Sequence, residues 1–193
     1  MRGRASGGNE SRGTCSVKES EVFSNFKRNN YFDGELLSAK DFQDEQDYLI
    51  EKRRLHNRFL HGYGVVTGLE VSISDDHPGT LEVGSGFAFD AQGNEVILPE
   101  TQYVPFPDVG KKACLVITYA ERETDFVPAQ TSECEEMVAR RVEEYAVLKL
   151  EATRAREEGS SCDEGIVLAR LKKRGGAWRL DKRLEVKRVI VGS

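Results

Sequence analysis

The stretch "RRLHNRFLHGYGVVTGLEV", residues 53–71, contains the point at which the sequence pattern changes from helical to extended. Apolar residues before this point recur at helical spacing, and Gly62 and Gly64 interrupt that pattern. From Leu69 to Ile73, apolar residues alternate with polar ones, which is typical of a half-buried strand. Because glycine often closes a helix in the left-handed conformation, the stretch predicts a helix, a glycine-bracketed turn and a first strand.

Residues 38–61 form the clearest predicted helix. Ser38 is suited to the N-cap position, and Asp41 stands where a capping box has its acid. Acidic residues come first in the helix and basic residues last, an order that complements the helix dipole. Ile50 lies opposite the apolar arc and is a candidate for a contact outside the domain. Six side chains on one arc predict an amphipathic stripe: Phe42, Tyr48, Leu49, Leu55, Phe59 and Leu60.

His56 and His61 raise the question whether the stretch is a catalytic or metal site. In a regular α-helix, a separation of five residues places two side chains about 140° apart, so one metal ion cannot bind both imidazoles. We interpret His56 as a core or interface residue and His61 as a partner of the C-terminal helix dipole. The sequence therefore predicts a structural joint, without catalytic, cofactor-binding or metal-binding residues.

Downstream of the joint, the sequence predicts about eight short strands. The polar segment 124–136 is expected to be a connection, and residues 143–152 suit a strand or a helix, with the strand favoured. The other expected elements are a turn at 75–79, a strand over 80–90 interrupted by Gly84 and Gly86, a hairpin turn at Gly93–Asn94, a central strand over 113–121, a loop over 156–165, two strands joined by a Gly-Gly turn over 166–181, and an alternating segment over 183–193.

This order of elements predicts a mostly-β (α+β) fold. We expect an antiparallel β-sandwich or barrel-like domain, preceded by one N-terminal amphipathic helix. Residues 1–24 are rich in Gly, Ser and Arg and read as a flexible arm. Residues 25–193 are expected to form a single domain that includes the helix.

Composition excludes several functional classes. The net charge of −5 argues against a general nucleic-acid binder. No apolar run approaches the ~20 residues that span a membrane, and no apolar segment of a secretory signal follows the N-terminal arginines. We therefore expect a cytoplasmic protein, or one assembled into a particle that is later released.

The cysteines at 15, 114, 134 and 162 form no Cys-x-x-Cys pair. Cys114 is expected in the core, and the redox state of the cysteines stays open.

Several local motifs have simpler structural explanations. Residues 90–95 carry oxygen ligands at alternate positions, but a hairpin turn accounts for them better than a calcium loop does. The glycines of "GSG" and "HGYG" do not fit a phosphate-binding loop, and no serine stands in Gly-x-Ser-x-Gly. A basic cluster beside Trp178 is expected at a hairpin tip: Lys172, Lys173 and Arg174.

Residues 29–71, "NYFDGELLSAKDFQDEQDYLIEKRRLHNRFLHGYGVVTGLEV", resemble a motif of phage-tail-related proteins encoded with the baseplates of contractile tails and extracellular contractile injection systems. In that group an aromatic-x-Gly-x-Leu-Leu segment leads a helix that ends in Arg-Arg-Leu-His-Asn-Arg, followed by Leu-His-Gly-aromatic-Gly-Val-Val-x-Gly-Leu. The similarity is good over residues 29–105 and loose over 113–184. It implies no catalytic residues.

The resemblance implies a structural or adaptor component that docks on a baseplate, spike or fibre. Its partners would be other subunits of that assembly, which leaves room for a homo-oligomer. Two alternatives are a glycan- or small-ligand-binding β-module, with exposed aromatics at Tyr63, Tyr103, Phe106 and Trp178, and a cell-wall hydrolase. Structural or interface candidates are Tyr31, Phe32, Ile50, Arg54, His56, Asn57, His61, Gly62, Gly64 and Gly68.

Overall fold

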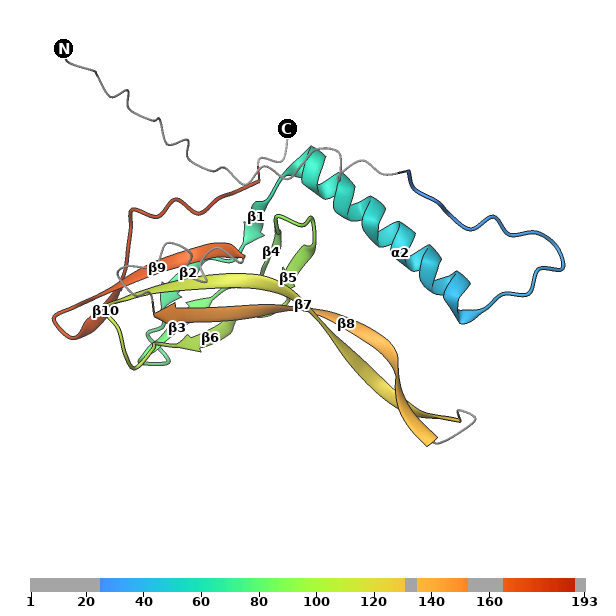
Figure 1. Cartoon of the computed structure of the whole chain (residues 1–193). Helices are drawn as coiled ribbons and strands as arrows, with labels where there is room; N and C mark the ends of the chain where they lie inside the picture. The colour runs from blue at the N-terminus through green and yellow to red at the C-terminus, as the bar shows by residue number, and fades with distance from the viewer. Residues whose placement is uncertain (1–24, 131–134, 153–164, 190–193) are drawn as a thin grey trace, which may run out of the picture. The chain divides into compact units, whose positions relative to one another are not determined.

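The computed structural model describes residues 25–130, 135–152 and 165–189. The predicted mostly-β fold with a leading helix is confirmed (Figure 1). The chain divides into two compact units, residues 1–49 and 50–193. The predicted arm at 1–24, the cysteines at 15, 134 and 162, and nearly all of the expected loop at 156–165 lie outside the described residues.

Ten strands form three antiparallel sheets within the described part of the second unit. The first sheet has the order β1-β4-β5, the second β10-β9-β7-β8, and the third β2-β3-β6. The strands are β1 (Gly64–Gly68), β2 (Val71–Ile73), β3 (Thr80–Val83), β4 (Gly86–Phe89), β5 (Glu95–Leu98), β6 (Gln102–Pro105), β7 (Lys112–Gln130), β8 (Glu135–Ala152), β9 (Ile166–Arg174) and β10 (Ala177–Leu180).

Helix α2 (Ala39–His56) begins with the predicted capping box. The backbone N–H and the hydroxyl of Ser38 both donate to Asp41 Oδ2, at 2.8 and 2.6 Å. Ahead of the helix, the Tyr31 hydroxyl donates to Glu45 Oε2 at 2.6 Å, and the Phe26 ring packs edge-on against Tyr48. The loop of the first unit is thus tied to the first three turns of its own helix.

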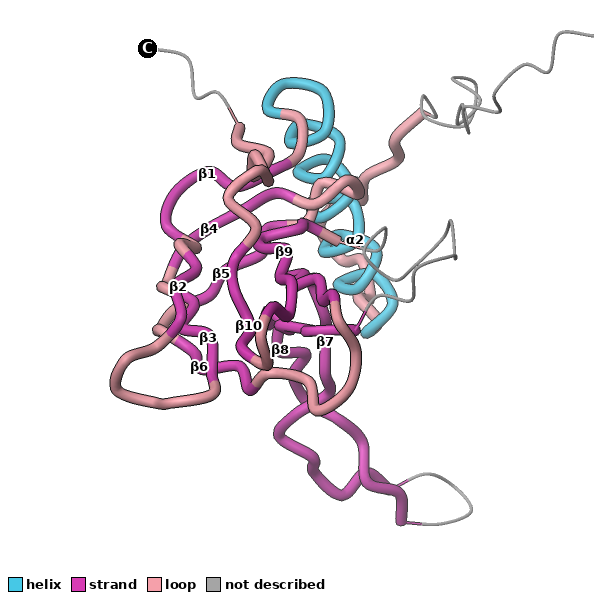
Figure 2. The backbone as a smooth tube through the Cα atoms, turned by 90° about the vertical axis from the view of Figure 1, so that its left-hand side faces the viewer, coloured by secondary structure: helices cyan, strands magenta, loops and turns pink. Residues whose placement is uncertain are grey.

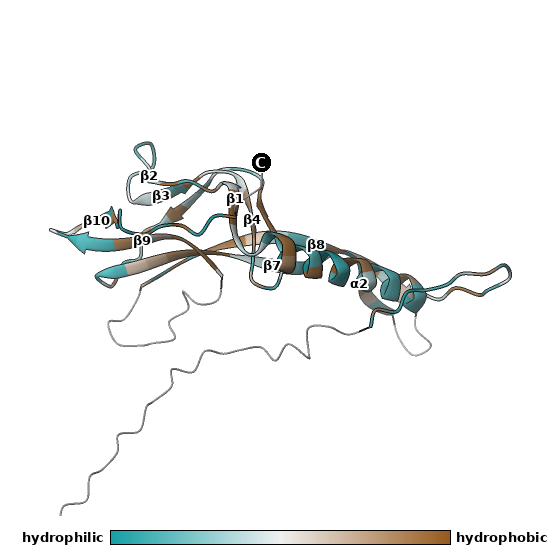
Figure 3. Cartoon of the chain, turned by 90° about the horizontal axis from the view of Figure 1, so that it is seen from above, coloured by the Kyte–Doolittle hydropathy of each residue, from teal (hydrophilic) through white to brown (hydrophobic). Residues whose placement is uncertain are grey.

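The predicted amphipathic stripe is largely exposed. Helix α2 has no buried residue along its 18 residues, and hydrophilic and hydrophobic positions alternate around it (Figure 3). The stripe residues with exposed side chains are Phe42, Leu49, Phe59 and Leu60.

The prediction of one regular helix through His61 is wrong in its last turn. The α-helix ends at His56, and Asn57–His61 form the π-helical turn η1. The N–H of Gly62 donates to the carbonyl oxygen of Asn57 at 3.0 Å, which closes the wider i→i+5 ring of a π-helix. Gly62 has φ 73°, so the chain leaves the turn through a positive φ, which glycine adopts without strain.

The predicted strand over 69–73 begins later, as β2 at Val71, and a separate strand, β1, precedes it in another sheet. β1 pairs with β4, whereas β2 pairs with β3, so residues 64–73 and 80–89 form one hairpin bent from the first sheet into the third. At the bend Leu69, a branched residue, has φ 58°. The Leu69 N–H donates to Ser85 O and the Gly84 N–H to Glu70 O, which keeps the two arms paired through the corner. The interruption predicted at Gly84 and Gly86 is therefore a change of sheet.

The second sheet confirms the predicted central strand and extends it. Residues 113–117 of β7 are all buried, and Cys114 lies in this interior as expected. The connection predicted over 124–136 is wrong, because β7 continues to Gln130 and β8 already begins at Glu135. Residues 143–152 are strand, which resolves that alternative. Beyond Ile117, β7 pairs with β8 alone, so the sheet continues as a two-stranded ribbon (Figure 2).

The alternating segment expected over 183–193 forms no strand within its described residues, 183–189. Residues 183–189 make only one parallel bridge, between Val65 and Arg188. The Val65 N–H donates to Lys187 O at 2.8 Å, and the Val189 N–H to Val65 O at 2.9 Å.

The hairpins predicted around Gly93–Asn94 and at the Gly-Gly turn are confirmed by the β4–β5 and β9–β10 pairs. The core cluster draws on all three sheets, with Leu81, Leu98, Leu115, Ile117 and Leu171 at its most buried positions.

Candidate functional site

The end of the helix is fastened to the β4–β5 turn by two side chains of the predicted joint. Asn57 is buried, and its Nδ2 donates to the carbonyl oxygen of Gly93 at 2.9 Å. Arg54 Nε donates to Asn94 Oδ1 at 2.6 Å. The Arg54 guanidinium also lies 2.9 Å from Glu51 and 3.6 Å from Glu121. Although Arg54 is partly buried, its pKa is raised above the ordinary value, because these carboxylates outweigh desolvation.

The turn that receives the helix is built around the buried carboxylate of Asp90. This carboxylate accepts hydrogen bonds from the backbone N–H groups of Gln92 and Asn94, at 2.9 and 2.8 Å, and from Asn94 Nδ2 at 2.8 Å. A Cβ atom at Gly93 would overlap the carbonyl oxygen of Arg54. Only glycine therefore allows the helix backbone to approach the turn so closely.

Two further glycines of the predicted joint permit close backbone contacts. A Cβ atom on Gly64, where φ is 139°, would lie 2.6 Å from the carbonyl oxygen of Lys187. On Gly68, where φ is 64°, it would lie 2.8 Å from the Cα of Gly86 and overlap the carbonyl oxygen of Ser85. These contacts explain the glycine spacing of the opening stretch. Gly64 lets the C-terminal segment approach β1, and Gly68 lets the backbone pass closely at the corner between the first and third sheets.

The expectation that helical geometry separates the two histidines is wrong. His56 Nε2 and His61 Nε2 lie 3.2 Å apart, and their ring centroids lie 5.1 Å apart. The cause is the π-helical turn, whose i→i+5 spacing brings residues five apart to the same side. Both side chains are exposed, which excludes the core alternative for His56 and leaves its interface alternative as a prediction. The His61 ring stacks on Phe89, with an interplanar angle of 13°.

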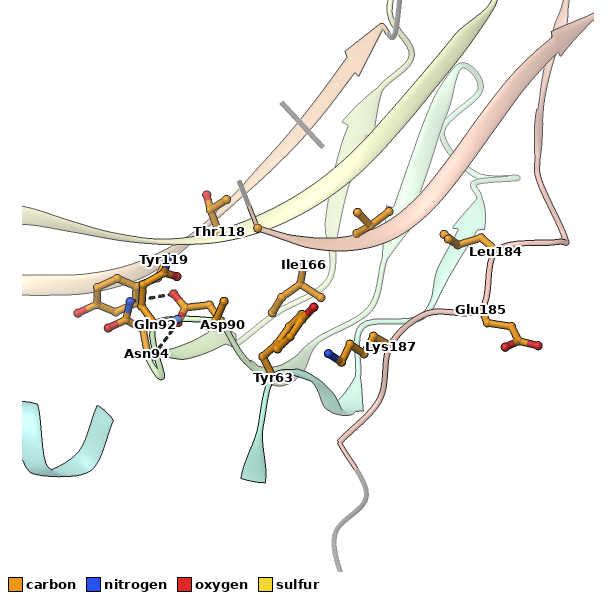
Figure 4. A pocket seen from close by; sticks show the side chains of 13 residues that line it. Tyr63, Asp90, Gln92, Asn94, Thr118, Tyr119, Ile166, Leu184, Glu185 and Lys187 are labelled. Carbon is orange, nitrogen blue, oxygen red and sulfur yellow. Dashed lines mark hydrogen bonds between the residues drawn. The ribbon is translucent and has the colours of Figure 1, made fainter. Parts of the chain in front are cut away.

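A cavity of about 650 Å³ lies beside the β4–β5 turn, between strands β7 and β9 and the C-terminal segment (Figure 4). The Nζ of Lys187 lies 3.1 Å from the ring centroid of Tyr63 at one side of it. At the other side, burial and the nearby carboxylates of Glu121 and Glu144 raise the pKa of Tyr119. Sequence reasoning missed this cavity, because its lining residues come from separate segments: Tyr63, Asp90, Gln92, Asn94, Thr118, Tyr119, Gly165, Ile166, Leu184, Glu185 and Lys187 are among them.

The aromatic residues expected to line a ligand groove do not form one surface. Trp178 is buried, and its ring stacks with Phe106 at 6.2 Å between centroids, so the expectation of an exposed Trp178 is wrong. Tyr103 packs edge-on against His77. Lys173 Nζ lies 5.5 Å from the Trp178 ring centroid, and Lys172 pairs with Asp181. The basic cluster therefore belongs to the β9–β10 hairpin tip, as predicted.

The remaining candidates lie in different surroundings. In the first unit, the Tyr31 ring is 44% exposed and held by Glu45, whereas Phe32 is 67% exposed. In the second unit, Ile50 is 38% exposed and borders a shallow hollow with Arg53 and Glu144. The structure thus brings Arg54, Asn57 and the joint glycines into packed contacts, and leaves the aromatic and aliphatic candidates exposed.

The described residues contain no helix long and apolar enough to cross a membrane. Within the same residues, no three His, Cys, Asp or Glu side chains gather closely enough to hold a metal ion.

No family model and no curated protein matches this sequence. Solved structures do match by fold. A chain in the cryo-electron microscopy structure of the type VI secretion system TssK-TssF-TssG baseplate subcomplex is 15% identical, with a TM-score of 0.53. That match covers 84% of this chain and 62% of the other. A chain in a structure of the baseplate complex from the type VI secretion system is 16% identical, with a TM-score of 0.52 and coverage of 84% and 60%.

The chain therefore spans about three fifths of the length of the chains it matches. At identities near 15%, the similarity to these chains is a similarity of fold. The predicted resemblance to proteins of phage-tail-like baseplates is confirmed at that level: the fold of this chain is similar to that of chains in type VI secretion baseplates.

Proposed function

We propose that this chain is a non-enzymatic structural or adaptor subunit of a phage-tail-like contractile apparatus, associated with its baseplate, spike or fibre. The observation that carries the proposal is the shared fold, which extends over 84% of the chain in both baseplate matches. Its partners would be other protein subunits of the assembly, and the protein would be found in the assembled particle. The net charge of −5 supports protein partners rather than nucleic acid.

The exposed apolar side chains of the loop and helix support a protein-binding role. Large exposed apolar groups are costly unless a partner covers them, and contiguous ones mark interaction sites. We assign contacts with neighbouring baseplate subunits to these side chains, which include the candidates Tyr31 and Phe32 in the first unit and, separately, Ile50 in the second. The other exposed side chains are Leu36, Leu37, Phe42 and Leu49 in the first unit, and Phe59 and Leu60 in the second.

The packed candidates have a different role in this proposal. Arg54 and Asn57 join the helix end to the β4–β5 turn, and Gly62 closes the π-helical turn. These contacts hold the last turn of the helix on the β4–β5 turn, within the second unit. In this proposal the packed candidates are structural, and the exposed side chains bind the partner.

The β7–β8 ribbon offers a second surface for assembly. It projects beyond the part of β7 that pairs with β9, and apolar side chains remain exposed along it: Phe126, Val127, Met137, Val138 and Val142. A ribbon of two strands is only marginally stable by itself in water. Cover from a neighbouring subunit would stabilise it, whether that subunit is a different protein or a second copy.

The test is co-purification of the full chain with intact contractile particles from the cell that produces it. We expect the chain to sediment with sheath and baseplate proteins at a fixed ratio. The variant Phe32→Ser/Leu36→Ser should lose at least ~10-fold of the particle-bound protein, because exposed apolar anchors carry much of the binding energy at interfaces. Both positions are exposed, Leu36 by 94%, so folding should be retained.

The matched control is Val109→Ser, which changes another exposed apolar residue, 74% exposed, in the second unit. This variant should stay with the particles. Consistent absence of the unmodified chain from intact particles would reject the proposed function. Retention of the Phe32→Ser/Leu36→Ser variant would reject only the assigned surface.

A further inference from the structure

The π-helical turn creates a pair of facing imidazoles that a regular helix would keep apart. The two Nε2 atoms are closer to each other, at 3.2 Å, than the two ring centroids, at 5.1 Å. Each ring therefore turns its Nε2 edge toward the other. Both side chains are exposed, so a solute can reach the space beside the two nitrogens.

This separation is the one that two imidazoles have when they share a metal ion. Two nitrogens bound at about 2.05 Å to one tetrahedral zinc ion lie about 3.3 Å apart, and about 2.9 Å apart at a right angle. The observed 3.2 Å falls within this interval. Ring carbon atoms would not block a metal ion, because the edges that face each other carry the Nε2 atoms.

The site is also partly preorganised by its surroundings. The His61 ring is stacked on Phe89 at 5.6 Å between centroids, and Phe89 is buried and packs edge-on against Phe87. The backbone of the turn is closed by the bond from the Gly62 N–H to Asn57 O. Support of this kind holds a ligand ring in one orientation, so less freedom is lost when a metal binds.

We propose that His56 and His61 form a two-imidazole binding site for a divalent transition-metal ion of the class that prefers imidazole, such as Zn²⁺ or Ni²⁺. Without metal, one ring donates its Nε2–H to the Nε2 of the other. On binding, the donor ring moves that proton to its own Nδ1 through solvent, and both Nε2 lone pairs coordinate the ion. No net proton is released, and water or a side chain of an assembly partner fills the other coordination positions. The proposal does not depend on the proposed baseplate function.

The chain supplies its own matched control, because it has three histidines and the third is elsewhere. The His77 ring packs edge-on against Tyr103, and the backbone N–H of His77 donates to Ser74 Oγ. The test uses the full chain without an affinity tag and compares His56→Gln, His61→Gln and His77→Gln. Circular dichroism of each variant checks that the fold is retained.

The first measurement is calorimetric titration with Ni²⁺. We expect His56→Gln and His61→Gln each to weaken binding by at least ~10-fold, because each removes one of two ligands held at high effective concentration. His77→Gln should bind as the unmodified chain does. Equal affinities for the unmodified chain and both pair variants, or loss in His77→Gln as well, would overturn the proposal.

The second measurement identifies the atoms and separates imidazole binding from binding by cysteine. Zn²⁺ is added to ¹⁵N-labelled protein while the ring nitrogens are followed by NMR. We expect the Nε2 signals of His56 and His61 to move together at one equivalent, with the His77 signals unchanged. Unchanged Nε2 signals in the presence of a tenfold excess of Zn²⁺ would overturn the proposal, whatever heat the calorimeter records.

Discussion

Helix α2 carries an apolar stripe and the centre of strand β7 is a continuous apolar run, yet the structure treats their apolar side chains in opposite ways. Residues 113–117 of β7 are buried on both faces, whereas helix α2 has no buried residue. β7 lies between strands β9 and β8, and its residues Ala113, Leu115 and Ile117 belong to the core cluster. The difference teaches that an apolar pattern indicates which side chains gather on a face, while the surroundings decide what covers that face.

The largest expected effect contrasts Leu115 of β7 with Leu60 of the turn η1, which continues helix α2. Leu115 is completely buried and Leu60 is 71% exposed. Leu115→Ala should lower the free energy of unfolding by about 2–5 kcal/mol, because it removes buried methyl groups and leaves a cavity. Leu60→Ala should change it by less than about 0.5 kcal/mol. Chemical denaturation of the two variants measures both, and a comparable loss in Leu60→Ala would remove the contrast between the regions.

The corner between the first and third sheets carries the next largest effect. Gly68→Ala places a Cβ against the Ser85 carbonyl group in a residue with φ 64°, so we expect a loss of about 2–3 kcal/mol. Gly84→Ala, across the same corner, is the control, because its Cβ would have no neighbour closer than 3.8 Å. Thermal unfolding of both variants should show a clear fall in melting temperature for Gly68→Ala alone. Equal melting temperatures would mean that the corner relaxes freely.

The attachment of the helix end to the β4–β5 turn gives a third test, because it is a buried contact at the end of an exposed helix. Asn57 is the only buried residue of η1, and it binds Gly93 O. Asn57→Ala leaves that carbonyl group without its side-chain donor, so we expect a loss of about 1–2 kcal/mol. Asn30→Ala, at an exposed position of the first unit, should cost much less. If the two variants unfold at the same denaturant concentration, the buried amide does not stabilise the joint.

Much of this architecture could be predicted because its signals are local. The capping box at Ser38 and Asp41, the turn after Asp90 and the apolar run at 113–117 each depend on neighbouring residues. In the first two cases a side chain bonds a group only a few positions away, and in the third the apolar residues are consecutive. Local hydrogen bonding and continuous apolar sequence are therefore reliable guides here.

The π-helical turn could not be predicted, because helical periodicity assumes 100° per residue throughout. One wider turn brings His56 and His61, which a regular helix would hold about 140° apart, into contact on the same side. The turn coincides with a tertiary contact, the hydrogen bond from Asn57 Nδ2 to Gly93 O, 36 residues further along the chain. The candidate metal site was missed for that reason alone: the residues were identified, but their geometry was not.

The bent hairpin and the ribbon were missed for other physical reasons. Leu69 adopts a left-handed conformation that branched residues rarely take, so nothing in its alternation with Val71 indicates a corner. In the ribbon, both faces are largely exposed, and the period-2 pattern of a half-buried strand is absent. Pairs such as Val127 with Val138 become visible only when the two strands are aligned.

The smallest expected effect concerns the exposed region alone and is a dependence on pH. Hydrogen bonds from the Ser38 hydroxyl and backbone N–H stabilise the charged form of Asp41 and hold the pKa of its carboxyl below the ordinary value of 3.8. A depressed pKa in the folded state contributes stability above the unfolded pKa, and that contribution is lost as the pH falls through the folded value. The helix start should therefore weaken only below about pH 4.

Carboxyl ¹³C NMR should give a midpoint for Asp41 below 3.8, and helical circular dichroism should fall over the same range. In Asp41→Ala this acid-dependent loss should be absent, whereas Asp33→Ala, before the helix, should retain it. A midpoint at or above 3.8 would show that the capping box does not hold the first turn, and the helix would then depend on a partner even for its start.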